Sequence, residues 1–271
     1  MTIADRIDAL LDRDLRTSKP RTNGITVMID KGQMGANTIA DFAAQAGAYC
    51  DYAKIAWGSS LITGNLVDKI ETYRKASIIP SLGGTLFEYA FLRNKVPQLF
   101  DLVKDLKIHI EISDGVIDLP RAEKLKWIEK FATVTDVWSE VGGKINRQDL
   151  DWKKVVHEEL SAGSKKIVVE GRELGPAGMA KEEDVRSEVV EKVLAGARLE
   201  DLVFEAFERR QQTWLVKHLG PNVNLANIPP TDLLTLESFR RGLKEHTLLH
   251  TAELISKRKA TSDEAAAKAK R

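Results

Sequence analysis

The 271-residue sequence contains a single cysteine, Cys50. One thiol can form neither an intrachain disulfide nor a cysteine-based zinc cluster. The five histidines are scattered along the chain, and only His109 falls in an expected strand, beside alternating apolar residues that favour a packing role. The sequence therefore gives no support for a Ser-His-Asp triad.

An excess of charge of one sign is also absent, because 41 Lys+Arg balance 40 Asp+Glu and leave a formal net charge of +1. Such a chain has no strong field to attract nucleic acid or an anionic membrane. No apolar run approaches the length of a membrane span, which is about 18 residues or more. The charged N-terminal segment lacks the apolar core of a signal peptide, and no glycine-rich nucleotide-binding motif occurs. We expect a cytoplasmic protein with no nucleotide cofactor and with no nucleic-acid or membrane partner.

What the sequence does contain is a series of short β-branched or apolar runs, each followed by a turn and a helical pattern. Strands that alternate with helices indicate a parallel sheet, and eight such units in a chain of this length favour a closed (β/α)8 TIM barrel. The expected strands are residues 25–30, 52–57, 77–82, 108–113, 133–141, 166–171, 202–206 and 222–227. We therefore predict an α/β fold with one barrel domain over residues 23–250.

Both ends of the chain lie outside this pattern. Residues 1–22 form an N-terminal extension in which Ile3, Ile7, Leu10 and Leu11 share one helical face. We expect this extra helix to cap the barrel floor or to pack on a neighbouring molecule. Residues 251–271 are rich in Ala, Lys and Arg and have almost no apolar face, so we expect a flexible, solvated tail.

Acidic residues recur where the expected strands end, which is the edge that carries the active site in barrels of this kind. They are Asp30, Glu111, Glu140, Glu170 and Glu205. Carboxylates gathered in one poorly solvated cavity repel one another and need cations. The nearby cations are Lys31, Lys54, Lys144 and Arg172, and a divalent metal could supply further charge. Oxygen ligands favour Mg²⁺ or Mn²⁺ over zinc, although some of these acids could instead form salt bridges within the barrel.

A glycine-rich turn, Gly83-Gly84-Thr85, follows the third expected strand and feeds a helix. Its backbone N–H groups could hold a phosphate or carboxylate group. The alternative is that the turn needs glycine for its geometry alone. After the eighth run, Asn222, Asn224 and Asn227 are further polar candidates at the same edge.

A series of motifs occurs in order along the chain: IDKG (29–32), AKIAWGSS (53–60), GGTLFEYA (83–90), EISDGVIDLP (111–120), SEVGGK (139–144), VVEGREL (168–174), FEA (204–206) with Gln211 and Gln212, VNLANI (223–228) and LESFRRGLK (236–244). With these motifs the chain resembles the phosphosulfolactate synthases, a (β/α)8-barrel family of archaea and some bacteria, over nearly all of residues 23–247. Heat-stress-associated proteins of plants are similar too.

The resemblance implies an Mg²⁺-dependent addition of sulfite to phosphoenolpyruvate, which gives 2-phospho-3-sulfolactate through a metal-stabilised aci-carboxylate. In methanogens this reaction opens coenzyme M biosynthesis. It also implies a homo-oligomer, with three subunits as the expected number, that acts on small molecules.

The resemblance also suggests roles for the residues at the strand ends. For the metal, Glu111, Glu140 and Glu170 are the leading ligands, followed by Asp30 and Glu205. Lys144 or Lys54 would deliver the proton, and Lys31 is the third lysine expected to be catalytic. The expected substrate-binding residues are Gly83, Gly84, Thr85, Arg172, Ser59, Ser113, Asn224 and Gln211.

Several rim loops depart from the family pattern. One of two lysines after the fifth strand is replaced by Gly143, and Phe207-Glu208 replaces a Pro-Gln pair after the seventh. The loop after the sixth strand reads Leu174-Gly175-Pro176-Ala177-Gly178, and Leu82 replaces a proline. Three readings therefore stay open beside the sulfite reaction: another nucleophile or acceptor, a metabolite-binding barrel, and a non-catalytic stress protein.

Overall fold

Eight parallel strands close into a barrel in which each strand pairs with the next and β8 pairs with β1. The computed structural model describes residues 1–11, 15–143, 150–171 and 186–269. The strands are β1 (Thr26–Asp30), β2 (Tyr52–Ile55), β3 (Ile79–Leu82), β4 (His109–Ile112), β5 (Val137–Val141), β6 (Lys166–Val169), β7 (Leu202–Glu205) and β8 (Leu225–Ile228). The predicted TIM barrel is confirmed, with each strand inside or within one residue of its predicted run.

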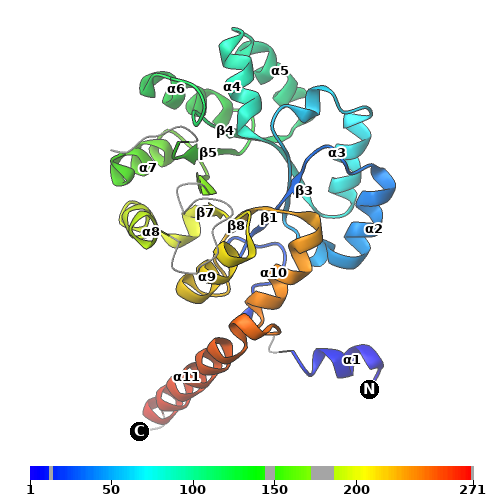
Figure 1. Cartoon of the computed structure of the whole chain (residues 1–271), viewed down its shortest axis with the longest axis vertical. Helices are drawn as coiled ribbons and strands as arrows, with labels where there is room; N and C mark the ends of the chain where they lie inside the picture. Colours follow the sequence, from blue (N-terminus) through cyan, green and yellow to red (C-terminus); the bar gives the residue numbers. More distant parts are fainter. Residues whose placement is uncertain (12–14, 144–149, 172–185, 270–271) are drawn as a thin grey trace.

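Helices cover the outside of the barrel, as Figure 1 shows in a view close to the barrel axis. They are α2 (Ala36–Ala46), α3 (Leu66–Lys75), α4 (Gly84–Leu92), α5 (Val96–Leu106), α6 (Arg121–Ala132), α7 (Trp152–Ser161), α8 (Ser187–Leu194), α9 (Arg209–Leu219) and α10 (Leu233–Arg240). Outside the barrel lie α1 (Ile3–Asp8) and α11 (Glu245–Ala269). Among the described helices, none combines the length and apolar character that crossing a membrane requires.

The strands alternate between two packed layers, because successive side chains of a strand point to opposite faces of the sheet. One layer fills the barrel interior and includes Val27, Trp138, Val168 and Val203. The other layer lies between the strands and the helices. It includes Ile110 and Ile112 of β4, which stand on either side of Glu111 in sequence. This alternation decides which polar residues at the strand ends reach the interior of the barrel.

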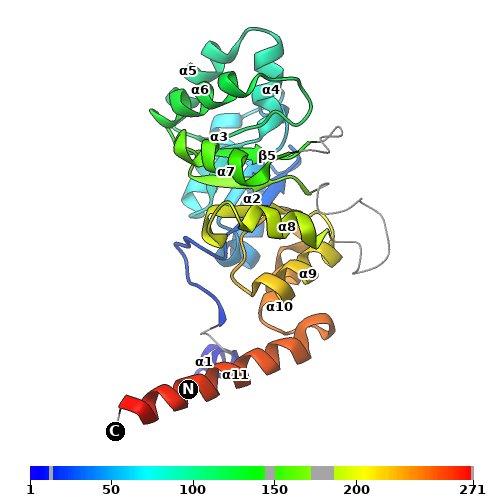
Figure 2. The same cartoon turned by 90° about the vertical axis from the view of Figure 1, so that its left-hand side faces the viewer.

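Both chain ends form helices outside the barrel, and the predicted packing of the N-terminal helix on a neighbouring molecule stays a prediction. The apolar side chains of the N-terminal helix do not cap the barrel floor, since Ile3 is 76% exposed and Leu10 85% exposed. At the other end, α11 continues through residue 250 and runs away from the barrel (Figure 2), where we expected a flexible tail. Ala, Lys and Glu are strong helix formers, so this composition supports a solvated helix as well as a tail.

The segment before β1 closes the N-terminal end of the barrel. Buried Arg16 donates to Glu237 of α10 at 3.1 Å and to the carbonyl of Gly24 at 3.1 Å. Arg240, also fully buried, donates to the carbonyls of Pro221 and Val223. These bonds occupy the end of the barrel opposite to the carboxylates, which leaves the C-terminal end for the site.

Candidate active site

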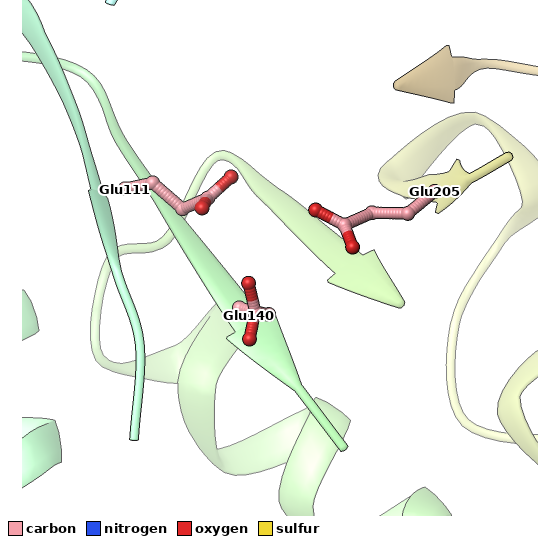
Figure 3. A group of neighbouring side chains, drawn as sticks. All are labelled: Glu111, Glu140 and Glu205. Carbon is pink, nitrogen blue, oxygen red and sulfur yellow. The ribbon is translucent and has the colours of Figure 1, made fainter. Parts of the chain in front are cut away.

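Three glutamates from three strands meet inside the C-terminal end of the barrel. Glu111 of β4, Glu140 of β5 and Glu205 of β7 each offer a carboxylate oxygen, and these oxygens lie within 4.8 Å of one another. Figure 3 shows the three side chains converging from their strands. All three residues are buried, with exposed fractions of 6%, 2% and 2%.

Strand alternation explains why these glutamates meet. Glu140 and Glu205 stand two residues after Trp138 and Val203, whose side chains fill the barrel interior, so they point the same way. Glu170 has the same relation to Val168 of β6 and is fully buried at the wall of the same cavity. Four of the five predicted acids therefore face one cavity.

Asp30 is the exception, and its prediction as a metal ligand is not supported by its position. Ile29 lines the cavity, so Asp30 lies on the outer face of β1. There its carboxylate accepts hydrogen bonds from Lys69 at 2.7 Å and Tyr73 at 2.8 Å, both on α3. It also accepts from the backbone N–H of Gly32 at 2.8 Å. Asp30 thus fixes α3 and the turn after β1.

Lys54 of β2 lies between two of the clustered glutamates. Its Nζ is 3.0 Å from Glu111 Oε2 and 2.9 Å from Glu205 Oε1. Burial alone would lower the pKa of Lys54, but the carboxylates of Glu111, Glu205 and Glu140 outweigh it and raise the pKa. A proton donor in a cavity crowded by cations would instead have a lowered pKa. The surrounding acids reverse the direction and keep the side chain protonated.

A cavity of about 150 Å³ opens above the cluster. Of the predicted residues, Lys31, Gly83, Gly84 and Thr85 line it together with Lys54 and the four glutamates. Lys31 is exposed at its mouth. Two aromatic side chains, Trp57 and Phe207, also line the cavity, with exposed fractions of 52% and 37%.

The glycine turn serves packing as well as the site. The N–H of Gly84 donates to Glu111 Oε1 at 3.0 Å, so this amide already holds a protein carboxylate. A Cβ at Gly84 would lie 2.4 Å from Ser113 Cβ, and one at Gly83 would lie 3.0 Å from the backbone N of Trp57. The alternative that geometry requires glycine here is supported, and the role in binding a substrate anion stays a prediction.

The two predicted serines occupy different places. Ser59 donates to the carbonyl of Ala56 at 2.7 Å and lines a neighbouring cavity of about 450 Å³, which Lys31 also borders. Ser113 is fully buried, with its Oγ 2.5 Å from Glu88 Oε1 and 3.1 Å from Glu140 Oε1. Ser113 therefore contacts a cluster member rather than opening onto the cavity.

Asn224 and Gln211 use their side chains to hold the backbone. Asn224 precedes β8 at the opposite end of the barrel, where it accepts from Ile25 N at 2.9 Å and donates to the carbonyl of Leu202 at 2.8 Å. Gln211 donates to the carbonyl of Gly171 at 3.2 Å and accepts from Glu208 N at 3.2 Å. Asn224 does not line the cavity, because β8 runs from 225 to 228 rather than from 222 to 227 and Asn224 stands before its first residue.

Asn227 is the asparagine that reaches the cavity. It lies at the C-terminal end of β8 and is 4% exposed, and its amide Oδ1 has no hydrogen-bond partner within the described part of the chain. Its φ of 61° is in the left-handed region, which non-glycine residues seldom adopt. Strain and a buried polar atom without a partner tend to occur together at functional sites. Strand alternation does not predict this placement, because Ala226 already faces the barrel interior. The register of β8 against β1 shifts at this point, and Asn227 reaches the cavity there.

Lys144 and Arg172, predicted as proton donor and anion contact, lie outside the described residues. Among the residues that are described, the polar lining of the cavity consists of four glutamates, two lysines, the glycine turn and Asn227.

The donor set of the cluster fits a hard divalent cation. Three buried carboxylates supply oxygen ligands only, which is the chemistry that Mg²⁺ and Mn²⁺ prefer over the nitrogen and sulfur ligands typical of zinc. The ammonium group of Lys54 balances only part of their negative charge. Glu111, Glu140 and Glu205 could thus hold such an ion.

Comparison with known proteins agrees with this geometry. Residues 14–246 match the family model for (2R)-phospho-3-sulfolactate synthase (ComA). The phosphosulfolactate synthase of Bacillus subtilis is 36% identical over 248 residues, covering 89% of this chain and 98% of the relative. That of Methanothermobacter thermautotrophicus is 34% identical over 244 residues, covering 86% and 94%.

Solved structures support the barrel fold alone. A 3-hexulose-6-phosphate synthase has a TM-score of 0.52 at 9% identity, covering 79% of this chain and 98% of its own. A dihydrodipicolinate synthase from Agrobacterium tumefaciens has a TM-score of 0.53 at 10% identity, covering 88% and 79%. The family match over most of the chain, together with the relatives above 30% identity, is decisive: this chain belongs to the phosphosulfolactate synthase family of enzymes.

Proposed function

We propose that this enzyme adds sulfite to phosphoenolpyruvate to form 2-phospho-3-sulfolactate, with Mg²⁺ as its cofactor. The observation that carries the proposal is the buried group of Glu111, Glu140 and Glu205 beside Lys54 in a barrel of this family. An enzyme of this family acts on small molecules, and we expect it to work in the cytoplasm as a homo-oligomer.

In the proposed reaction the sulfur lone pair of sulfite attacks the methylene carbon of phosphoenolpyruvate. A C–S bond forms, and the π electrons of the C=C bond move toward the substrate carboxylate. A proton then adds to the carbon that bears the phosphate. When bound by the three glutamates, Mg²⁺ would act as a Lewis acid for the charge that develops on the carboxylate.

The residues of the chain supply cations for the reactants, which are all anions. Lys54 stays protonated between Glu111 and Glu205 and places an N–H donor inside the cavity. Lys31 at the mouth adds a second positive charge, which favours entry of the anionic substrates. Lys54 and Lys144 are the two candidates for the proton donor, and the raised pKa of Lys54 makes it a weak acid, which favours Lys144 for this step.

The cavity walls favour exclusion of water from the reacting carbon. Ile29 and Ala56 line the cavity beside the glutamates, and Trp57 and Phe207 border it. An apolar wall strengthens the electrostatic interactions inside a site. It also protects charge on the substrate from premature protonation by solvent.

The same two aromatic rings favour a second candidate function, in which another nucleophile replaces sulfite. Sulfite has no apolar part that Trp57 or Phe207 could contact, whereas a thiol or another organic nucleophile would have one. We rank this candidate second because the family match covers residues 14–246. A non-catalytic barrel is less well supported, because four buried glutamates facing one cavity cost stability unless they bind a cation.

The proposal is tested by following loss of the enolpyruvate double bond by ultraviolet absorbance. The purified protein is mixed with phosphoenolpyruvate, sulfite and Mg²⁺. The proposal predicts loss that requires all three components and stops with EDTA or in the Glu140→Gln variant. Turnover that continues in EDTA would contradict the metal, and turnover only with an organic thiol would favour the second candidate.

A further inference from the structure

We propose that one face of helix α4 positions two of the three clustered carboxylates. Gly84 holds Glu111 directly, and Glu88 holds Glu140 through Ser113, so that Glu88 and Ser113 are positioning residues for the metal site. The inference rests on the proposed function, because it concerns how readily these carboxylates bind Mg²⁺ or Mn²⁺.

Gly84 and Glu88 lie four residues apart, and residues at this spacing share one face of a helix. Both are buried against β4, the strand that carries Glu111. The N–H of Gly84 donates to Glu111 Oε1 at 3.0 Å. This amide belongs to the first turn of α4, where backbone N–H groups favour a carboxylate. The start of the helix thus fixes Glu111.

One turn later, Glu88 reaches Glu140 through a hydroxyl. Ser113 Oγ lies 2.5 Å from Glu88 Oε1 and 3.1 Å from Glu140 Oε1. The same oxygen accepts the N–H of Gly115 at 3.3 Å. A serine hydroxyl has one proton, so it can donate to only one carboxylate at a time. Ser113 Oγ therefore donates to Glu88 or to Glu140 in turn, and its 2.5 Å approach to Glu88 fixes the position from which it donates to Glu140.

The close approach of α4 and β4 is built into the sequence. A Cβ at Gly84 would lie 2.4 Å from Ser113 Cβ, so a larger residue would push the helix away from Ser113. The backbone of Glu140 is held separately, because Lys124 of α6 donates to its carbonyl at 2.6 Å. Helix α6 therefore fixes the main chain of Glu140, and the Glu88–Ser113 pair contacts its carboxylate.

A role limited to packing would look different from a role in the metal site. If Ser113 and Glu88 only stabilise the fold, their variants lower stability without changing affinity for the ion. If they hold Glu140 in place, affinity falls even when the fold is intact. Residues that orient metal ligands typically contribute about 10–100-fold to metal affinity.

The test measures binding of Mn²⁺ alone, without substrate, to the full-length protein by the loss of the free-ion signal in electron paramagnetic resonance. Ser113→Ala is compared with the wild type and with Ser139→Ala. Ser139 is a matched control, because it is also fully buried and precedes Glu140, but its Oγ bonds to Ser164 at 2.9 Å. We expect the Mn²⁺ dissociation constant to rise about 10–100-fold in Ser113→Ala and to stay unchanged in Ser139→Ala.

Glu88→Gln provides a second variant of nearly the same shape, in case loss of the serine impairs folding. A neutral amide accepts a weaker hydrogen bond than a carboxylate, so Ser113 Oγ is held less firmly, and the Mn²⁺ affinity should differ from that of the wild type by a smaller factor than in Ser113→Ala. Because Glu88 acts through Ser113, adding Glu88→Gln to Ser113→Ala should change the affinity no further.

Three results would overturn the inference. Wild-type affinity in Ser113→Ala and Glu88→Gln would show that neither residue positions the cluster. A full additional effect of Glu88→Gln in the Ser113→Ala protein would show that Glu88 acts by another route. Absence of Mn²⁺ binding in the wild type would overturn the metal site of the proposed function together with this inference. The first two results would overturn this inference alone, because the wild type would still bind Mn²⁺.

Discussion

Lys54 on β2 forms an ion pair with Glu205 on β7 across the interior of the barrel, with 2.9 Å between Nζ and Oε1. The two strands are not neighbours in the sheet. Because Lys54 also contacts Glu111 on β4, one ammonium group joins carboxylates from separate strands. The lysine and a metal ion would therefore act on the same carboxylates, which makes charge balance the central property of this site.

Replacing Lys54 with Met should abolish turnover and destabilise the metal-free protein. The change leaves Glu111 and Glu205 without their buried cation, and removing one partner of a buried ion pair costs about 3–5 kcal/mol. Denaturant unfolding in EDTA should show this loss, and Mg²⁺ should restore part of it by supplying positive charge. An equal loss with and without Mg²⁺ would contradict a shared site.

The pH dependence of that ion pair has a definite sign. Because the pKa of Lys54 is raised in the folded state, the pair contributes fully at any pH at which its carboxylate partners are ionised and which lies below the unfolded lysine value of about 10.4. The contribution is lost only as pH rises through the higher folded-state pKa. The difference in unfolding free energy between wild type and Lys54→Met should thus stay constant from about pH 7 to 9. A difference that fell steeply within this range would contradict the raised pKa.

Asp30→Asn should lower stability and leave Mn²⁺ affinity nearly unchanged. The substitution leaves the buried Lys69 ammonium without its carboxylate partner, at a cost of about 3–5 kcal/mol. Glu140→Gln should show the opposite pattern, with a large loss of metal affinity. Thermal midpoints and Mn²⁺ titrations of both variants separate the two roles. A strong loss of Mn²⁺ binding in Asp30→Asn would contradict this assignment and show that Asp30 contributes to the metal site.

Asn227→Gly should raise KM for phosphoenolpyruvate by about tenfold, the effect of losing one hydrogen bond from the amide NH2 group to the anionic substrate. Glycine adopts the left-handed conformation of residue 227 without strain, so the fold and the thermal midpoint should be preserved. Steady-state kinetics beside a melting curve would distinguish a substrate contact from a conformational role. An unchanged KM would show that the amide does not touch the substrate.

Cys50 should resist thiol reagents at about pH 8 in the folded protein and react only after unfolding. Burial raises the pKa of its thiol to about 12. The unfolded thiol ionises from about pH 8.5, so the unfolding free energy falls as pH rises between these two values. At about pH 9.5 the loss due to Cys50 should be about 1.4 kcal/mol, and Cys50→Ala should lack it. Rapid labelling of the native protein would contradict this burial.

Much of the barrel and of its acidic rim could be predicted from the sequence. The β-branched runs located every strand, because a parallel barrel is buried on both faces and needs continuous apolar segments. Glu111, Glu140, Glu170 and Glu205 stand near the ends of those runs, and the predicted strand ends therefore placed them at the edge where they line one cavity. Family resemblance added the chemistry that spacing alone did not identify.

The errors came from orientation and context. Asp30 was placed with the other acids because it ends a strand, although the alternation of Val27 and Ile29 puts it on the outer face. Asn224 was chosen over Asn227 because the start of β8 was placed too early. The pKa of Lys54 depends on Glu205 and Glu111, which lie 151 and 57 residues away in sequence. Such contacts follow from barrel closure rather than from any local pattern.

The most direct test of the whole account is phosphorus NMR of the purified protein with phosphoenolpyruvate, sulfite and Mg²⁺, beside an EDTA control. The account predicts that the phosphoenolpyruvate signal is replaced by a phosphate-ester signal matching authentic 2-phospho-3-sulfolactate, and that EDTA prevents the change. Phosphoenolpyruvate that stays intact with active, metal-loaded protein would contradict the proposed reaction and direct attention to another nucleophile at the cavity bordered by Trp57 and Phe207.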